Sequence, residues 1–312
     1  MKKMMICVVI LLVSTVSADS TITVVCTTTA LESLVEDVGG EKVDVISLVQ
    51  PGVCPSHFDV RPSHIQEVGQ ASLIMYHGVE PWLDDLITAS QGHPVKILIE
   101  GPWNTPDFAV EKTERIRDAL IQVDPENTEY YTQNAEEIIE EVRKMADAII
   151  KEAELLQLDT IPVICMDWQK YIVEWMGFEI AGTYPPPETL SVKDVNSLIS
   201  TGKVEDVVLV IDNLQSGTEV GKEIASQIGG YHVVLTNFPH AVPGTDSVPA
   251  LIEYNARQLL DAVTVYNEEK GEISELKSEL EKEKEKKVFF EVISLLLLVV
   301  CIVEAVLYVR KK

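Results

Sequence analysis

Short apolar runs alternate with helical patterns through the first part of the chain, and this alternation limits the fold more than any other feature. Runs rich in Val and Ile cover residues 21–26, 43–49, 72–78 and 95–100, and helical patterns cover 30–39, 64–71 and 81–90. Strands that are apolar at almost every position are buried on both faces, which is typical of a parallel sheet covered by helices. We therefore predict an N-terminal α/β lobe over residues 19–125.

The same plan recurs later in the chain. Apolar runs at 161–166, 178–184, 207–212 and 231–236 predict a second α/β lobe over 157–267. Between the lobes, residues 126–156 contain neither Gly nor Pro and carry apolar residues at helical spacing. At about 1.5 Å per residue such a helix is about 45 Å long, enough to contact both lobes. The predicted fold is a clamshell: two parallel-sheet lobes joined by one rigid spine helix, with a ligand cleft between them.

The two ends of the chain predict where the protein resides. Residues 1–18 have a basic start, an apolar centre and small residues before the expected cleavage point, as a secretory signal peptide does. Residues 268–287 predict a charged helical stalk, with dimerisation through its narrow apolar stripe as the lesser alternative. The apolar stretch 288–309 predicts a transmembrane anchor, followed by a basic cytoplasmic tail at 310–312. We expect a single-pass cell membrane protein with an extracytoplasmic ectodomain.

Charge and motifs exclude two classes of function. The formal net charge is −25 at pH 7, which argues against nucleic acid as a partner because phosphate binding needs clustered Lys and Arg. The sequence has no G-x-S-x-G, H-E-x-x-H, Walker A or G-x-G-x-x-G motif. We therefore predict a binding protein and no enzyme.

In a parallel sheet, ligands bind at the carboxyl ends of the strands, and this rule selects candidate residues by position. Residues near predicted strand ends include a set with sulfur and imidazole side chains: Cys26, Cys54, His57, Cys165 and His240. A second set offers aromatic, thioether and polar side chains: Ser56, Trp103, Asn104, Met166, Trp168 and Asn237. His77 lies at the end of an apolar run, and we expect it to pack in the core or at the edge of the sheet.

Four phrases carry a family resemblance: SLVQPGVCP, RPSHIQEVGQASLIMYHG, DPENTEYYTQNA and LIEYNARQL. With the order of elements, they make residues 21–266 similar to the ZnuA/TroA-like family, the metal-binding receptors of zinc and manganese ABC importers. The resemblance implies an ABC permease as partner. Family members hold metal with histidines and a carboxylate, but this chain departs from that pattern. The family's ligand positions fall on Ser56, Gly101, Met166 and Asn237, with His57 and His240 nearby.

Three interpretations of the cleft remain open. In the first, Cys54, His57, Cys165 and His240, with Cys26 nearby, bind Zn or a softer transition metal ion. In the second, the cleft holds a metal chelate or an organic solute on aromatic faces such as Trp103 and Trp168. In the third, a disulfide between Cys54 and Cys165 locks the cleft, which suits a surface interaction protein without a transport role.

Overall fold

The computed structural model describes residues 21–310, with side chains up to Phe290 and at Ile293. The predicted signal peptide lies outside the described residues, as do the last two residues of the predicted tail. In the first lobe, each of four strands is followed by an α-helix. These elements are β1 (Ile22–Cys26), α1 (Thr29–Gly39), β2 (Val43–Ser47), α2 (Pro62–Gln70), β3 (Leu73–Tyr76), α3 (Leu83–Ser90), β4 (Val95–Leu98) and α4 (Pro106–Val123). Three short 3₁₀ turns in the same region are η1 (Gly40–Lys42), η2 (Pro55–His57) and η3 (Pro125–Asn127).

The second lobe follows the long helix α5 (Thr128–Leu156). Its strands and helices are β5 (Pro162–Met166), α6 (Lys170–Met176), β6 (Glu179–Tyr184), α7 (Val192–Val204), β7 (Leu209–Asn213), α8 (Glu219–Ile228), β8 (Tyr231–Leu235) and α9 (Val248–Arg310). Short 3₁₀ turns lie between them: η4 (Leu158–Thr160), η5 (Asp167–Gln169), η6 (Pro187–Thr189) and η7 (Leu214–Ser216).

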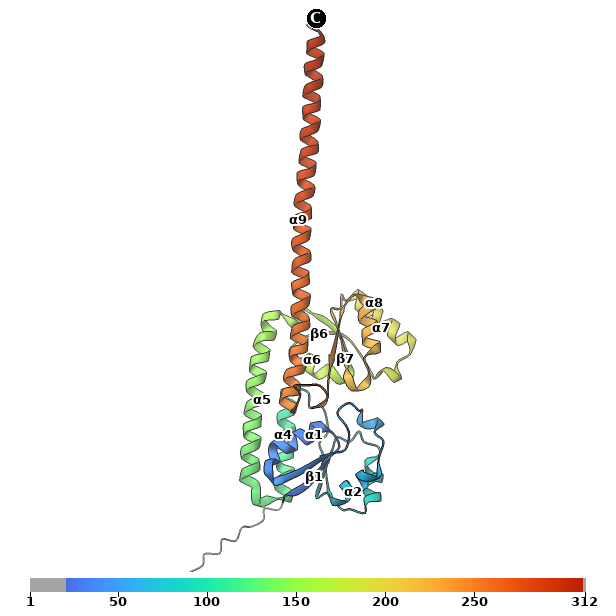
Figure 1. Ribbon diagram of the computed structural model, residues 1–312, viewed down its shortest axis with the longest axis vertical. Coiled ribbons are helices and arrows are strands. Elements are labelled where there is room, and N and C mark those ends of the chain that lie inside the picture. The colour runs from blue at the N-terminus through green and yellow to red at the C-terminus, as the bar shows by residue number, and fades with distance from the viewer. Residues whose placement is uncertain (1–20, 311–312) are drawn as a thin grey trace, which may run out of the picture.

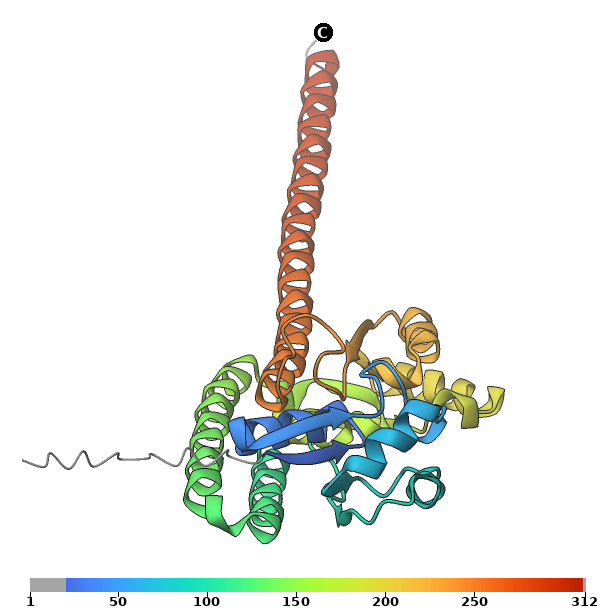
Figure 2. The same ribbon diagram turned by 60° about the horizontal axis from the view of Figure 1, so that its bottom comes forward.

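Each lobe is built on a four-stranded parallel sheet. The strand orders are β2-β1-β3-β4 and β6-β5-β7-β8, so the two lobes have the same topology. Figures 1 and 2 show the sheets flanked by helices in each lobe. The predicted two-lobe α/β fold is confirmed, and α4, which the apolar pattern did not single out, is an additional helix.

Alternation along the strands explains how the cores form. In the first lobe, Val24 and Cys26 face α1, α4 and α5, whereas Val25 faces α2 and α3. In the second lobe, Cys165 faces α5, α6 and α9, whereas Met166 faces α7 and α8. Successive side chains of a strand point to opposite faces, so helices on both sides bury residues 24–26 of β1 and 163–166 of β5.

Helix α5 is the spine of the molecule. Its first half buries Tyr131 and Ala135 in the core of the first lobe, and its second half buries Ile149 and Ala153 in the core of the second. Figure 1 shows α5 running beside both lobes. Because a single helix contributes to two cores, large rotation of one lobe against the other would expose apolar surface, which limits opening of the cleft.

The prediction of a membrane anchor over 288–309 is contradicted. Crossing a bilayer requires a long apolar helix, and none of the helices in the described residues is both long enough and apolar enough. Residues 288–309 form the last part of α9, the same helix that carries the charged stretch 268–287. The predicted single-pass localisation is therefore wrong. This applies also to the cytoplasmic placement of residues 310–312 and to the membrane as a partner through this helix.

Candidate functional site

A pocket of about 310 Å³ lies between the lobes, at the carboxyl ends of both sheets. The first lobe lines it with Cys54, Pro55, Ser56, His77, Val79, Gly101, Pro102, Trp103 and Asn104. The second lobe lines it with Trp168, Tyr171, Asn213, Gln215, Ser216, Asn237 and Phe238. Since these segments follow β2, β3, β4, β5, β7 and β8, parallel topology alone brings them together.

The structure brings together six of the predicted site residues. Cys54, Ser56, Trp103, Asn104, Trp168 and Asn237 all line the pocket. Met166 does not, because it is fully buried in the layer between the second sheet and helices α7 and α8. A side chain that points from the strand into this layer cannot also reach the pocket beyond the end of the strand.

The predicted sulfur and imidazole ligands do not converge. Cys26 and Cys165 are both fully buried, each in the core of a different lobe. His57 and His240 are exposed and do not line the pocket. In the described part of the chain, no three His, Cys, Asp or Glu side chains form a group that could hold a metal ion. The expectation that Cys26, Cys54 and Cys165 all point into one cleft is wrong, because strand alternation turns Cys26 and Cys165 into the cores.

The two buried thiols, Cys26 and Cys165, are also unsuited to ligation as thiolates. Burial raises the pKa of the Cys165 thiol to about 12 and raises that of Cys26 well above its usual value. Cys26, Cys54 and Cys165 are all free thiols in the structure, so the described cleft carries no disulfide between Cys54 and Cys165.

Trp103 holds the two lobes together through the centre of the site. Its ring stacks on His77 of the first lobe, with centroids 4.1 Å apart, and on Phe238 of the second, with centroids 5.5 Å apart. Its indole Nε1 donates to the backbone oxygen of Asn237 at 2.5 Å. The structure is therefore a form in which the lobes are in direct contact across the pocket.

Asn104 has an unused acceptor at the pocket. The side chain is 3 % exposed, and its Nδ2 donates to the backbone oxygen of Trp168 at 3.0 Å and toward Gln169 Oε1 at 3.5 Å. Its Oδ1 is buried without a hydrogen-bond partner. Both Nδ2 partners are acceptors, which fixes the orientation of the amide. A buried carbonyl oxygen without a donor costs free energy, so a solute that donates to Asn104 Oδ1 gains affinity.

Gln215 is a pocket residue that the sequence reasoning missed. Its Nε2 donates to Pro51 O in the first lobe at 2.9 Å and to Thr236 Oγ1 in the second at 2.8 Å. Its Oε1 accepts from the backbone N–H of Asn237 at 3.0 Å. Gln215 follows β7, so the rule about strand ends could have found it if it had been applied to that strand as well. Asn213, at the end of β7, was missed for the same reason, whereas Tyr171 and Phe238 follow strands to which the rule was applied and were not selected.

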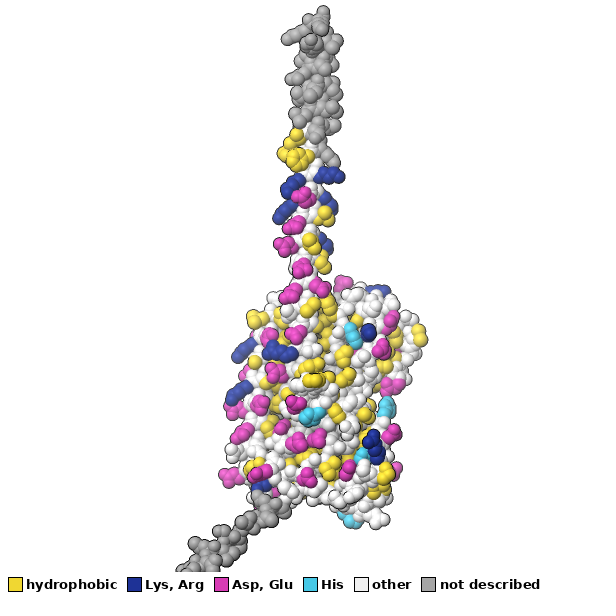
Figure 3. All heavy atoms as spheres, in the orientation of Figure 1, with side chains coloured by type: hydrophobic (Ala, Val, Ile, Leu, Met, Phe, Trp, Pro, Cys, Tyr) yellow, Lys and Arg dark blue, Asp and Glu magenta, His cyan; other side chains and the backbone are white. Residues whose placement is uncertain are grey.

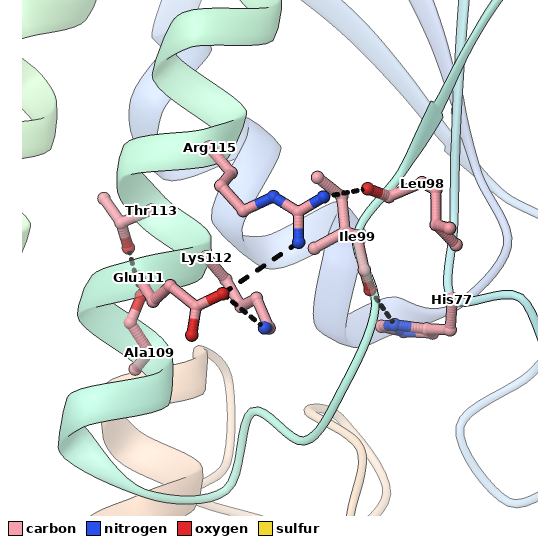
Figure 4. Close-up of polar contacts among 8 residues, drawn as sticks. All are labelled: His77, Leu98, Ile99, Ala109, Glu111, Lys112, Thr113 and Arg115. Carbon is pink, nitrogen blue, oxygen red and sulfur yellow. Dashed lines mark hydrogen bonds and ion pairs between the residues drawn. The ribbon is translucent and has the colours of Figure 1, made fainter.

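His77 packs in the core, as expected, but it also forms part of the pocket wall. Figure 4 shows its ring beside Ile99, whose backbone oxygen lies 3.1 Å from Nδ1. A carbonyl only accepts, so Nδ1 carries the proton and Nε2 accepts from the Thr28 hydroxyl at 2.8 Å. Burial lowers the pKa of His77 to about 4. The ring is neutral at pH 7, and both of its nitrogens are already in use.

The charges around the pocket do not favour a bare cation. No Asp or Glu lines it. The buried carboxylate of Glu80 lies nearby, but its oxygens accept from Thr27 Oγ1 and from the backbone N–H groups of residues 77–79. Lys112, also buried, places Nζ 3.5 Å from where a Cβ on Gly101 would lie, and its ion-pair partner is the half-exposed Glu111 at 3.1 Å (Figure 4).

Gly101 explains one departure from the expected ligand pattern. Its φ is +90°, a backbone conformation that residues other than glycine rarely adopt. A histidine at this position would therefore need a different loop conformation. At Asn237, the place of the expected carboxylate, the side chain is a neutral amide whose Oδ1 accepts from Gln169 Nε2 at 3.0 Å.

Two parallel-sheet lobes, a shared spine helix and a pocket between the lobes define the class of two-lobe solute-binding proteins. The profile of one family in this class, the periplasmic component A of the zinc-uptake complex, matches residues 24–262. The chain belongs to this ZnuA family, which describes a solute-binding component and not an enzyme.

Individual relatives are distant. A Treponema pallidum relative named for metal binding is 24% identical over 249 residues, which cover 66% of this chain and 76% of that one. The iron-binding protein YfeA of Yersinia pestis is 26% identical over 149 residues, and the match covers 41% of this chain and 48% of YfeA. The chain thus spans about half the length of that second relative.

Solved structures support the fold. The cadmium-bound periplasmic metal-binding protein of Candidatus Liberibacter asiaticus superimposes with a TM-score of 0.70 at 18% identity, covering 78% of this chain and all of that chain. At this level of identity the likeness establishes the architecture and leaves the solute open.

Proposed function

We propose that this chain is the extracytoplasmic solute receptor of an ABC importer, and that its solute is a transition metal held within an organic chelate. The observation that supports the proposal best is the composition of the interlobe pocket. It offers aromatic faces, amides and one thiol, but no carboxylate and no available imidazole. A bare divalent cation needs anionic or imidazole ligands, whereas a chelate brings its own.

The individual contacts suit such a solute. Trp168 is 50 % exposed and Tyr171 is 43 % exposed at the pocket, so both offer faces for a planar ligand. Asn104 Oδ1 offers an acceptor to an N–H or O–H of the solute. The absence of Asp and Glu from the described pocket lining favours a neutral or anionic chelate over a cation. Relatives named for iron and for metal binding support a transition metal as part of the cargo.

Transport follows from the two-lobe architecture. A solute that contacts Ser56 and Trp103 on one lobe and Trp168 and Asn237 on the other stabilises the closed form over the open form. The closed form then docks on a permease partner. The domain limits that accompany this proposal are 19–125 and 157–267 for the lobes, with the spine at 126–156 between them.

The test is the composition of the bound solute. The full chain is purified from its native host without chelator, and elemental analysis is combined with mass spectrometry of the small molecules released on denaturation. About one equivalent of a transition metal together with one organic ligand supports the proposal. Metal without an organic ligand contradicts it, because the pocket would then be binding a bare ion.

A second candidate is an organic solute without metal, which the aromatic lining of the pocket also favours. Release of an organic molecule with no metal would establish this candidate in place of the chelate. Fluorescence titration distinguishes the two independently, since Trp103 and Trp168 both line the pocket. Chelated iron should quench their emission at concentrations where the same metal as a free salt has no effect.

A further inference from the structure

The part of α9 beyond the body carries an unpartnered apolar stripe. Ile273, Leu276 and Leu280 are 52 %, 64 % and 56 % exposed, and residues 267–290 are all exposed. Figure 3 shows apolar side chains among charged ones on the projecting helix. Three large aliphatic side chains on one face of a helix in water favour association with another apolar surface.

The stripe fits the positions that pack in a coiled coil. With Ile273 at heptad position a, Leu276 falls at d and Leu280 at the next a. The positions that flank this seam all carry charge. The g positions are Glu272 and Glu279, and the e positions are Lys277 and Lys284.

The charges on the two edges select the partner and its direction. In a parallel pair of identical helices, each g residue lies near the e residue five positions later on the other helix. Glu272 then lies near Lys277 of the second copy, and Glu279 near Lys284 of the second copy. In an antiparallel pair, g faces g and e faces e, so Glu would face Glu and Lys would face Lys. Only the parallel arrangement pairs opposite charges at both edges.

We propose that α9 mediates self-association: residues 272–284 form a short, parallel, in-register coiled coil with a second copy of this chain. This inference does not depend on the identity of the solute. The seam is short because the next d and a positions are Glu283 and Lys287. Three apolar layers give a weak, concentration-dependent dimer, which allows receptors to pair and separate.

The exit of α9 from the body leaves room for this pairing. Glu269 still contacts the second lobe by accepting a hydrogen bond from Tyr231 Oη. Gly271 follows, and a Cβ added there would meet no atom within 4 Å. Glycine lowers the cost of a local bend between the body and the seam. The α9 helices of two copies can therefore pair beyond residue 271 without fixing how the two bodies are oriented.

Cysteine crosslinking of the full chain tests the register. Leu276→Cys places a thiol at d, and Ser278→Cys places one at f on the outer face. Both variants carry Cys301→Ser to remove a native thiol from the same helix. Under mild oxidation we expect Leu276→Cys to form disulfide-linked dimers at least about tenfold faster than Ser278→Cys, because d side chains meet across a parallel seam. Equal rates at the two positions would overturn the proposal.

Charge exchange tests the choice of partner. One variant carries Glu272→Lys and Glu279→Lys, the other carries Lys277→Glu and Lys284→Glu, and both include Leu276→Cys and Cys301→Ser. Each alone presents like charges at both edges and should crosslink more slowly than the parent. An equimolar mixture restores opposite charges and should recover the parental rate. Failure of the mixture to recover, or a single monomeric species in sedimentation velocity at all concentrations, would show that α9 does not pair with itself.

Discussion

The indole Nε1 of Trp103 donates to the backbone oxygen of Asn237 at 2.5 Å, which joins the loop after β4 in one lobe to the loop after β8 in the other. The same indole ring lies between His77 and Phe238. One side chain therefore forms both the aromatic wall of the pocket and a hydrogen bond that closes it. Solute binding and lobe closure are linked through this residue.

Replacing Trp103 with Phe should open the cleft. The substitution keeps an aromatic ring next to His77 but removes the donor to Asn237, a loss of about 1 kcal/mol. We expect a larger radius of gyration by small-angle X-ray scattering in the absence of solute. The matched control is Trp82→Phe, which removes an indole hydrogen bond to Pro55 O within the first lobe and should leave the scattering curve unchanged. An unchanged curve for Trp103→Phe would mean that this bond does not hold the lobes together.

Replacing Asn104 with Ala should weaken solute binding by roughly fivefold to tenfold, since one hydrogen bond contributes about 1 kcal/mol net. The variant removes the buried oxygen that lacks a donor in the structure. Isothermal titration with the solute recovered from the native host gives the affinity. Asn134→Ala is the control, because Asn134 on α5 donates to Val38 O on α1 and neither residue lines the pocket. Equal affinities for the two variants would argue against a contact between solute and Asn104.

His77 should make the fold sensitive to acid. Its folded pKa of about 4 lies below the usual 6.5, so between these values the unfolded chain binds the extra proton and the folded chain does not. The contribution of His77 to the free energy of unfolding is complete above pH 6.5. It is lost as the pH falls toward 4, by roughly 3 kcal/mol in all. In urea unfolding, His77→Gln should show a shallower loss of stability over this window than the parent.

Asp37 should change the pH dependence of stability in the direction opposite to His77. Burial raises its pKa to about 6 from the usual 3.8, so the folded chain binds the extra proton between these values. Its contribution is complete below pH 3.8 and is lost as the pH rises through 6, which partly masks the effect of His77. Asp37→Asn should therefore steepen the loss of stability on acidification. If both variants shift the slope in the same direction, the assignment of the two protonation states is incorrect.

Cys54 should be the reactive thiol among the three cysteines of the two lobes. It is partly exposed at the pocket, whereas Cys26 and Cys165 are fully buried and their thiol pKa values are raised. Alkylation of the native protein, read by peptide mass spectrometry, should label Cys54 first and the other two only after unfolding. Bound solute should slow the labelling of Cys54. Rapid native labelling of Cys165 would show that the second lobe opens locally.

Local sequence determined the architecture of this protein. Apolar runs separated by helical patterns specify parallel strands buried on both faces, and 31 residues without Gly or Pro at 126–156 specify the spine helix. The rule about strand ends then placed Cys54, Ser56, Trp103, Asn104, Trp168 and Asn237 at one pocket, because parallel topology forces those ends together.

Only the tertiary structure decided which chemistry the pocket offers. The period of two along a strand turned Cys26 and Cys165 into the cores, and the turn at Pro55–His57 left His57 in solvent. The hydrogen bonds of His77, the unpartnered Oδ1 of Asn104 and the bridge made by Gln215 depend on contacts between residues far apart in the chain. Spacing in a sequence gives the position of a side chain along the backbone. Its direction, its partners and its protonation depend on the neighbours that folding brings to it.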